Sequence, residues 1–488
     1  FAGYQGDGSG YGGDGVQLGG GDLVNRGAIS GGVSEFGSGG AGVSLPFGAG
    51  SVMNYGVIAG GRGVAGPGGV GVSIQGRVLT NHGVITGGNS DTGVAGVGVS
   101  LAFGGMMTNY GVIAGGVSNR YRNFGFFDGV GVTLAGTLVN RGLIQGGGGA
   151  VGVVTSFAYA SMVENAGTIQ GLNQSVVFNS NRDVLVADAG AQFIGAVVGG
   201  GGNFELAGGT GVITGLGGSG QLTGDDSAVF SGFGSYGIDA GGVWSLSGTN
   251  ALGAGQSLTV DGGLIVGGSL HEAAGATVTV DRGGALRFQG SGQTLAGSIV
   301  NQGLVAVRGT TLTITGPAGG DGRAQVTDGT LAVASALAGK VEFAGASAVL
   351  DLSQSRNFTG SISNFAAGGQ DVLDLGDIAF TGAGEATFTG DASGGLLTVS
   401  DGTNTASIRL IGDYLGDSFV AASDGAGGVA ITAAASAAPS AHPLVAAMAG
   451  LGAAASTSSL GAGTTSRIAR CCSRAAHGPD PGRALLTA

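Results

Sequence analysis

The strongest constraint on the fold is a short motif, Asn-x-Gly followed by aliphatic residues and glycine, which recurs at intervals of 25 to 31 residues. A second motif, Gly-Val-x-Leu or Gly-Val-x-Ile, keeps the same period, as at 71–74 and 98–101. Repeats of this length predict a solenoid, because one repeat cannot bury its apolar face alone whereas stacked copies can. The repeated asparagine falls at Asn25, Asn54, Asn81, Asn109, Asn140 and Asn165.

Each half of the repeat has the chemistry of a short β-strand. Runs such as 98–101 and 111–113 contain β-branched residues and are flanked by glycine, and no stretch between them fits a helix. Strands of about 4 to 6 residues fill one repeat, and copies stacked about 4.8 Å apart pair in parallel. The sequence therefore predicts an all-β chain folded as a parallel β-helix, or β-solenoid, with Val99 and Leu101 pointing inward.

Composition excludes several other classes of protein. Glycine supplies 113 of the 488 residues, yet there are only 7 prolines and no strict triplet period, which argues against collagen. The mean hydropathy of +0.37 is too apolar for a disordered chain. The net charge is −12 and Lys340 is the single lysine, so we expect no nucleic-acid partner. No apolar run is long enough to predict a membrane-spanning segment.

The recurring asparagine predicts a ladder of side-chain amides. Asparagine at the same corner of every repeat allows each amide to bond to the next along the stack, and asparagine also suits tight bends. The segment 295–304 matches 134–143 nearly residue for residue, so we expect Asn301 to belong to this structural ladder as well. A ligand site lined by asparagines is the alternative, but the periodicity does not require one.

The residue after the asparagine varies between repeats, which indicates an outward position. Aligned along one edge, these residues would form a mixed aromatic and cationic stripe able to stack on sugar rings or to contact a partner protein. Simple solvent exposure is the alternative. The candidate binding stripe consists of Arg26, Tyr55, His82, Tyr110 and Arg141.

Signatures of catalysis and metal binding are sparse. Asp225 and Asp226 lie in a turn, where solvated corner acids are the simplest explanation, so we predict no catalytic residues and no enzyme activity. A partial resemblance of 368–374 to a calcium-binding repeat makes Asp371, Asp374 and Asp377 weak candidates for Ca²⁺, with acid-rich turns as the alternative. No other cofactor is expected, because the histidines are dispersed.

Changes in the repeat divide the chain into four parts. Regular β-helix repeats of about 28 residues cover 1–182, and a less regular continuation covers 183–350. An atypical segment, 351–432, is predicted to be a C-terminal β cap module, because the last rung otherwise exposes an open strand edge. The remainder, 433–488, is an Ala/Gly/Ser-rich linker and a disordered tail that carries Cys471, Cys472 and several arginines.

The Asn-x-Gly-x-Ile-x-Gly rungs and the Leu-x-Val-x-x-Gly-Gly stretches resemble the passenger domain of bacterial autotransporter adhesins and related Gly-rich secreted β-helix proteins. The resemblance covers about residues 10–350 and concerns repeat grammar rather than an active-site signature. It implies a right-handed β-helix that is exported to the outside of a Gram-negative cell. The alternating strands of a membrane β-barrel are not evident after residue 430, so the export route stays open.

The resemblance implies a function in adhesion or as a surface scaffold. We therefore expect a non-catalytic extracellular or cell-surface protein whose partners are surface proteins or glycans of a host or neighbouring cell, with self-association also possible. Two alternatives stay open. One is a carbohydrate-active β-helix enzyme, either a polysaccharide lyase or a hydrolase, and the other is a self-assembling fibre or surface-layer subunit.

Overall fold

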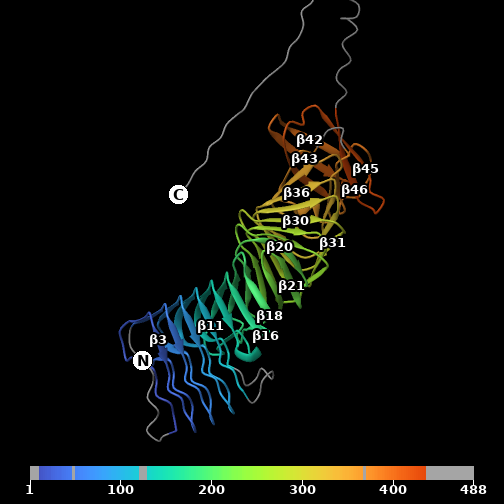
Figure 1. The fold of residues 1–488 in the computed structure, drawn as a ribbon. Helices are drawn as coiled ribbons and strands as arrows, with labels where there is room; N and C mark the ends of the chain where they lie inside the picture. The colour runs from blue at the N-terminus through green and yellow to red at the C-terminus, as the bar shows by residue number, and fades with distance from the viewer. Residues whose placement is uncertain (1–9, 47–49, 120–128, 366–369, 436–488) are drawn as a thin grey trace, which may run out of the picture. The chain divides into compact units, whose positions relative to one another are not determined.

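The computed structural model describes residues 10–46, 50–119, 129–365 and 370–435, and the predicted tail with Cys471 and Cys472 lies outside these ranges. The described chain is built from short strands that stack mainly in parallel, which confirms the β-solenoid (Figure 1). Within these residues, no helix has the length and hydropathy that a membrane span would need.

The first part is a stack of rungs with three strand positions each, and equivalent residues pair in register. Val43 pairs with Val72, Val72 with Val99 and Val99 with Val132, so every rung repeats the one before it. The first position holds β1 (Val16–Gln17), β4 (Val43–Leu45), β7 (Val72–Gln75) and β14 (Val153–Thr155). The second holds β2 (Leu23–Asn25), β5 (Ser51–Asn54), β8 (Val78–Asn81) and β15 (Met162–Asn165), and β10 (Val99–Asn109) and β12 (Val132–Asn140) span both. The third holds β3 (Ala28–Ser30), β6 (Val57–Ala59), β9 (Val84–Thr86), β11 (Val112–Ala114), β13 (Leu143–Gln145) and β16 (Thr168–Val177), with a 3₁₀ turn, η1, at Gly147–Gly149.

A three-stranded insertion interrupts the parallel stack in the middle of the chain. The strands β20 (Thr210–Thr214), β21 (Gly220–Gly224) and β22 (Ser227–Ser231) pair antiparallel with one another. On one face of the solenoid these three strands lie between β18 and β24. On the adjoining face no strand is inserted, and β17, β19 and β23 pair with one another in succession. The surrounding strands are β17 (Val184–Ala187), β18 (Gln192–Val198), β19 (Asn203–Leu206), β23 (Ser235–Ile238) and β24 (Val243–Leu246).

After the insertion the rungs become shorter and a separate nine-stranded sheet begins at β25. That sheet contains β25 (Thr249–Leu252), β28 (Ser269–Glu272), β31 (Gln293–Leu295), β34 (Thr311–Ile314), β37 (Thr330–Val333), β39 (Val349–Leu352) and β41 (Val372–Leu375). The other faces are formed by β26 (Ser257–Val260), β27 (Gly263–Val266), β29 (Thr277–Val280), β30 (Ala285–Gln289), β32 (Ser298–Asn301), β33 (Leu304–Arg308), β35 (Ala318–Gly319), β36 (Arg323–Thr327), β38 (Lys340–Ala344) and β40 (Ser361–Ser363). A second 3₁₀ turn, η2, spans Ser355–Asn357.

Antiparallel strands cover the C-terminal rung. They are β42 (Ala386–Asp391), β43 (Gly394–Ser400), β44 (Thr405–Ile411), β45 (Asp417–Ser423) and β46 (Val429–Ala435). β44 pairs with β40 of the stack and β46 pairs antiparallel with β41, so hairpins occupy the edge of the last rung. Parallel pairing still joins β39 to β41, beyond residue 351. The cap therefore begins at β42, later than the sequence pattern placed it.

The interior is filled by rows of equivalent apolar residues. Leu45, Ile74, Leu101 and Leu134 form one such row, and each is buried. Burial of one such side chain contributes about 1.5–3 kcal/mol. Larger aromatic side chains, among them the fully buried Trp244, lie in and beside the insertion. The apolar core is thus continuous from rung to rung.

Glycine permits the close approach of neighbouring backbones in the N-terminal rungs. A Cβ added at Gly40 would overlap the carbonyl oxygen of Gly13, and one added at Gly69 would overlap that of Gly40. Neither glycine has a positive φ. The requirement at these positions is therefore steric, and it explains why glycine recurs with the period of the rungs.

The six asparagines of the first part form one continuous buried ladder. Each side-chain Nδ2 donates to Oδ1 of the next asparagine at 2.8–2.9 Å, from Asn25 through to Asn165. Each Oδ1 also accepts the backbone N–H of the glycine two residues later, at 3.1–3.3 Å. The ladder therefore fixes the corner and the register of every rung together.

Asn301 does not belong to this ladder, contrary to the prediction. It pairs with Val280 on the preceding rung, where no amide is available. It keeps only the local part of the motif, accepting from Gly303 N at 3.1 Å and donating to Arg323 O at 3.0 Å. The segment 295–304 forms the same turn as 134–143, but the rungs beside it lack the asparagines that a ladder requires.

Substitution of Asn81 by alanine removes an amide in the middle of the ladder. The amides of Asn54 and Asn109 would each lose a partner inside the stack, so we expect a loss of roughly 2–4 kcal/mol in the free energy of unfolding. Urea denaturation followed by far-UV circular dichroism measures this loss. Asn301→Ala is the matched control and should cost less than half as much, and equal losses would contradict a cooperative ladder.

Candidate functional site

The residues of the predicted stripe lie in a single row on the outer edge of the first five rungs. The backbone N–H of Tyr55 donates to Asn25 O at 2.8 Å. The backbone N–H of each later member likewise donates to the carbonyl oxygen of the ladder asparagine one rung back, at 2.7 Å. All of them are exposed, although the asparagine before each is buried. We call this set the edge row, and it comprises Arg26, Tyr55, His82, Tyr110 and Arg141.

The rings of the edge row stack on one another along the solenoid. Tyr55 and His82 have ring centroids 5.0 Å apart with planes 5° from parallel, and His82 and Tyr110 lie 4.8 Å apart at 6°. The guanidinium carbon of Arg26 lies 4.8 Å from the centroid of the Tyr55 ring. Both faces of Tyr55 and of His82 are therefore covered, so these two rings offer their edges and polar atoms rather than a face for a sugar, while Tyr110 is covered by His82 on one face.

Exposed apolar side chains flank the edge row. Met53 and Val57 stand on either side of Tyr55, and the Tyr55 hydroxyl lies 3.0 Å from Met53 Sδ. Val24 and Met106 are each at least half exposed on neighbouring rungs. Exposed apolar side chains gathered beside a row of rings in this way are typical of an interaction site, because exposed apolar residues on a monomer's surface are usually scattered singly.

The same row continues past Arg141 with carboxylates, which the sequence reasoning missed. The backbone N–H of Ala166 donates to Asn140 O at 2.8 Å. In the same way, each later member of the row donates its backbone N–H to a carbonyl oxygen one rung back, at 2.8–3.0 Å, and this oxygen belongs to the residue just before the row member of that rung. The sequence contained a signal for these residues, because each of them directly follows the last inward-facing residue of a strand at the second position. We call the later members the acidic row, and they are Asp188, Asp239, Asp261 and Asp281, with Ala207 between the first two.

Burial first, and neighbouring aspartates second, raise the pKa values of three carboxyl groups in and beside the acidic row. Burial, followed by repulsion from Asp188, raises the pKa of Glu164, although Arg141 opposes this at 3.4 Å. Burial and then Asp239 raise the pKa of Glu205. Burial and then Asp261 raise the pKa of Asp239 itself. The acidic row is thus a stretch of unneutralised negative charge that would gain from nearby cations.

Asp226 is not a solvated corner acid, contrary to the prediction. It is fully buried, and Oδ1 accepts the backbone N–H groups of Gly190 and Ala191 at 2.9 and 3.0 Å. Burial raises its pKa to about 6. Asp225 instead accepts Thr210 N at 2.7 Å, so the pair fastens the three-stranded insertion to the corner before β18.

The three weak calcium candidates do not converge. Asp371 accepts Ala348 N at 2.8 Å, while Asp374 lies near Asp351 and Asp424, where burial first and these two acids next raise its pKa to about 6. In the described part of the chain, no group of three or more His, Cys, Asp or Glu side chains could hold a metal ion. The three aspartates are therefore not gathered into one cluster.

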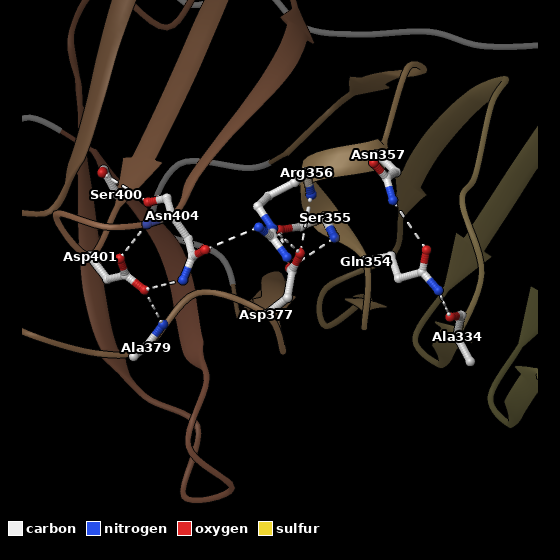
Figure 2. A network of polar contacts seen from close by, with 10 residues as sticks. All are labelled: Ala334, Gln354, Ser355, Arg356, Asn357, Asp377, Ala379, Ser400, Asp401 and Asn404. Atoms are coloured by element: carbon white, nitrogen blue, oxygen red, sulfur yellow. Dashed lines mark hydrogen bonds and ion pairs between the residues drawn. The ribbon is translucent and has the colours of Figure 1, made fainter.

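Asp377, the third candidate, belongs to a network that joins the stack to the cap. Asp377 accepts Ser355 N at 2.9 Å and Arg356 Nε at 3.0 Å, and Arg356 Nη1 donates to Asn404 Oδ1 at 3.0 Å. Figure 2 shows the Arg356 side chain between Asp377 and Asn404, with Asp401 beyond. The acid-rich turn is accounted for by this structural role.

A hollow of about 650 Å³ lies beside the insertion, next to the first strands of the nine-stranded sheet. Glu272 is the only carboxylate among its lining residues, and it is almost fully buried in a row between Leu252 and Leu295. Burial raises its pKa to about 7, partly offset by the backbone N–H groups of Gly297 and Val278. A single inward carboxyl does not provide the acid pair that glycoside hydrolysis needs.

Comparisons with known proteins add little beyond the fold. No protein-family model matches the sequence, and no curated protein matches it. A similar solved structure is the autotransporter UpaB from E. coli strain CFT073, at 13% identity over 80% of this chain and 90% of that one, with a TM-score of 0.19.

Glu272 should make stability depend on pH. Its pKa is near 4.5 in the unfolded chain and about 7 in the fold, so the folded form binds the extra proton between these values. Stability is therefore full below pH ~4.5 and falls as the pH rises toward 7, by up to roughly 3 kcal/mol. Glu272→Leu should reduce the fall in stability between pH 5 and pH 8 by about this amount and be the more stable chain at pH 8, as measured by urea denaturation at both pH values, while Asp226 and Asp374 keep a smaller slope of the same sign. An equal slope in the variant would show that Glu272 is not the group responsible.

Proposed function

We propose that the chain is a non-catalytic, secreted or cell-surface β-solenoid of the autotransporter-passenger type, and that it acts in adhesion through the edge row. The observation that carries the proposal is the row of exposed rings and cations along five successive rungs, stacked on one another from Arg26 to Tyr110 and flanked by exposed apolar side chains. Exposing such a surface does not help the chain fold, so its presence favours contact with a partner.

The chemistry of the row favours a partner that reads edges and polar atoms. Tyr hydroxyls, the His82 imidazole and the guanidinium groups of Arg26 and Arg141 point away from the buried asparagines. All of these groups can donate hydrogen bonds and the two guanidinium groups carry positive charge, while Met53 and Val57 supply apolar contact. A protein surface, or a polar glycan held by its hydroxyls, fits this description better than a sugar stacked on a ring face.

Loss of the rings should weaken adhesion without unfolding the chain. The double variant Tyr55→Ser, Tyr110→Ser removes two exposed rings and leaves the ladder intact, so we expect binding of the purified chain to cultured cells to fall about tenfold or more. Flow cytometry with the labelled chain measures this binding.

Phe36→Ser is the matched control, because Phe36 is 82% exposed and lies away from the edge row. It should bind like the parent chain. Equal binding by the parent and the double tyrosine variant would overturn the proposal that the edge row is the contact surface, whatever the partner is.

A carbohydrate-active enzyme is the second candidate, and one observation favours it. Asp351 and Asp374 occupy paired positions on adjacent rungs, and the pKa of Asp374 is raised to about 6 by burial, Asp351 and Asp424. Adjacent rungs place such groups about 5 Å apart, near the spacing of a retaining glycosidase. Release of reducing ends from polysaccharides, abolished by Asp374→Asn, would support this candidate against the non-catalytic one.

A further inference from the structure

The outer corner row changes sign along its length. Counting one backbone bond per rung, five members from Arg26 to Arg141 precede Ala166, and five from Asp188 to Asp281 follow it. The first half contains two arginines and a histidine but no acid, and the second contains four aspartates but no cation. Folding alone does not require this segregation, because all of these positions face outward at the same corner.

Successive members of the row have the same spacing in both halves, about 4.8 Å, because the strands of successive rungs pair in parallel throughout. If a second copy runs antiparallel, with a twofold axis at Ala166, each member meets the one at equal distance on the other side of the axis. The matched pairs are then Arg141 with Asp188, Tyr110 with Ala207, His82 with Asp239, Tyr55 with Asp261, and Arg26 with Asp281.

We propose that a second copy of this chain docks side by side and antiparallel on this row, the edge row of each copy against the acidic row of the other. The inference rests on the proposed role of the edge row as a contact surface, and it names the partner. Both arginines of the edge row and its histidine meet an aspartate, and the small Ala166 lies at the axis, where the two backbones approach most closely.

Electrostatics within one copy favours the pairing. Burial first, and repulsion from neighbouring aspartates second, raise the pKa values of Glu164, Glu205 and Asp239 in and beside the acidic row. Within one copy, Arg141 lies 3.4 Å from Glu164, and both side chains stay partly exposed. A second copy would bring two arginines and a histidine to the acidic row and relieve this repulsion. The apolar flank of Val24, Met53 and Met106 then adds area to the contact.

Sedimentation equilibrium of the purified chain tests the self-association. We expect a monomer–dimer equilibrium at low salt that weakens as the ionic strength rises, because the contact is built on partly exposed charge pairs. A chain that stays monomeric at all accessible concentrations in low salt would overturn the proposal.

Charge exchange between the halves tests the geometry. One variant, Arg26→Asp, His82→Asp, Arg141→Asp, makes the whole row acidic, and another, Asp188→Arg, Asp239→Arg, Asp281→Arg, makes it basic in both halves. Each alone should dimerise about tenfold or more weakly, because like charges meet across the axis. An equimolar mixture should restore association, because an acidic row then meets a basic one. The triple variant Arg308→Asp, Lys340→Gln, Arg409→Asp lowers the formal net charge by the same amount as the acidic variant, at exposed sites outside the row, and should leave the equilibrium unchanged.

The outcomes separate this inference from the proposed function. Failure of the mixture to associate, or equal weakening by the control triple, would overturn the antiparallel pairing. A chain that binds cells through Tyr55 and Tyr110 but never dimerises would leave the proposed function standing and remove only the second copy as partner. A chain that dimerises but does not bind cells would do the reverse.

Discussion

The buried asparagine ladder is the interaction on which the rest of the first part depends. Each amide bonds to the amides above and below and to the turn that follows it, so one side chain fixes a corner and a register together. In a parallel stack a slip of one residue would turn every inward side chain outward. Because the amides find their hydrogen-bond partners only when the rungs are in register, the ladder favours a single register. The outer residue that follows each asparagine is therefore aligned with its equivalents on the neighbouring rungs.

Glycine and low charge have the same physical origin. The backbones of neighbouring rungs pack so closely at positions such as Gly40 and Gly69 that no Cβ fits, and most polar groups there are backbone amides paired between rungs. Most charged side chains therefore lie at corners and on outer faces, and Asp226 and Glu272 are among the buried exceptions. Since those positions contribute little to folding, their chemistry is free to vary, and the segregation of cations from carboxylates along one corner is informative for that reason.

Much of the architecture was predictable from the sequence, because the period of the asparagine fixes the rung, and the residue after it fixes the edge row. What failed depended on neighbours rather than on local pattern. Asn301 carries the right turn but faces Val280, and Asp226 sits in a polar turn that the insertion buries. The acidic row escaped notice because its members follow Ala187, Ile238, Val260 and Val280 rather than asparagine, so the motif was lost while the position was kept.

The most direct test is the NMR chemical shift of the His82 ring protons, because the asparagine ladder positions this ring between those of Tyr55 and Tyr110. The chain has four histidines, so selective ¹³C labelling of histidine gives a readable NMR spectrum, and His82→Gln assigns the resonance. Stacking 5.0 and 4.8 Å from Tyr55 and Tyr110 predicts ring protons shifted upfield of those of the exposed His271, and the shift should shrink in Tyr55→Leu and in Asn81→Ala. A His82 signal at the position of His271 in the parent chain would contradict the ordered row.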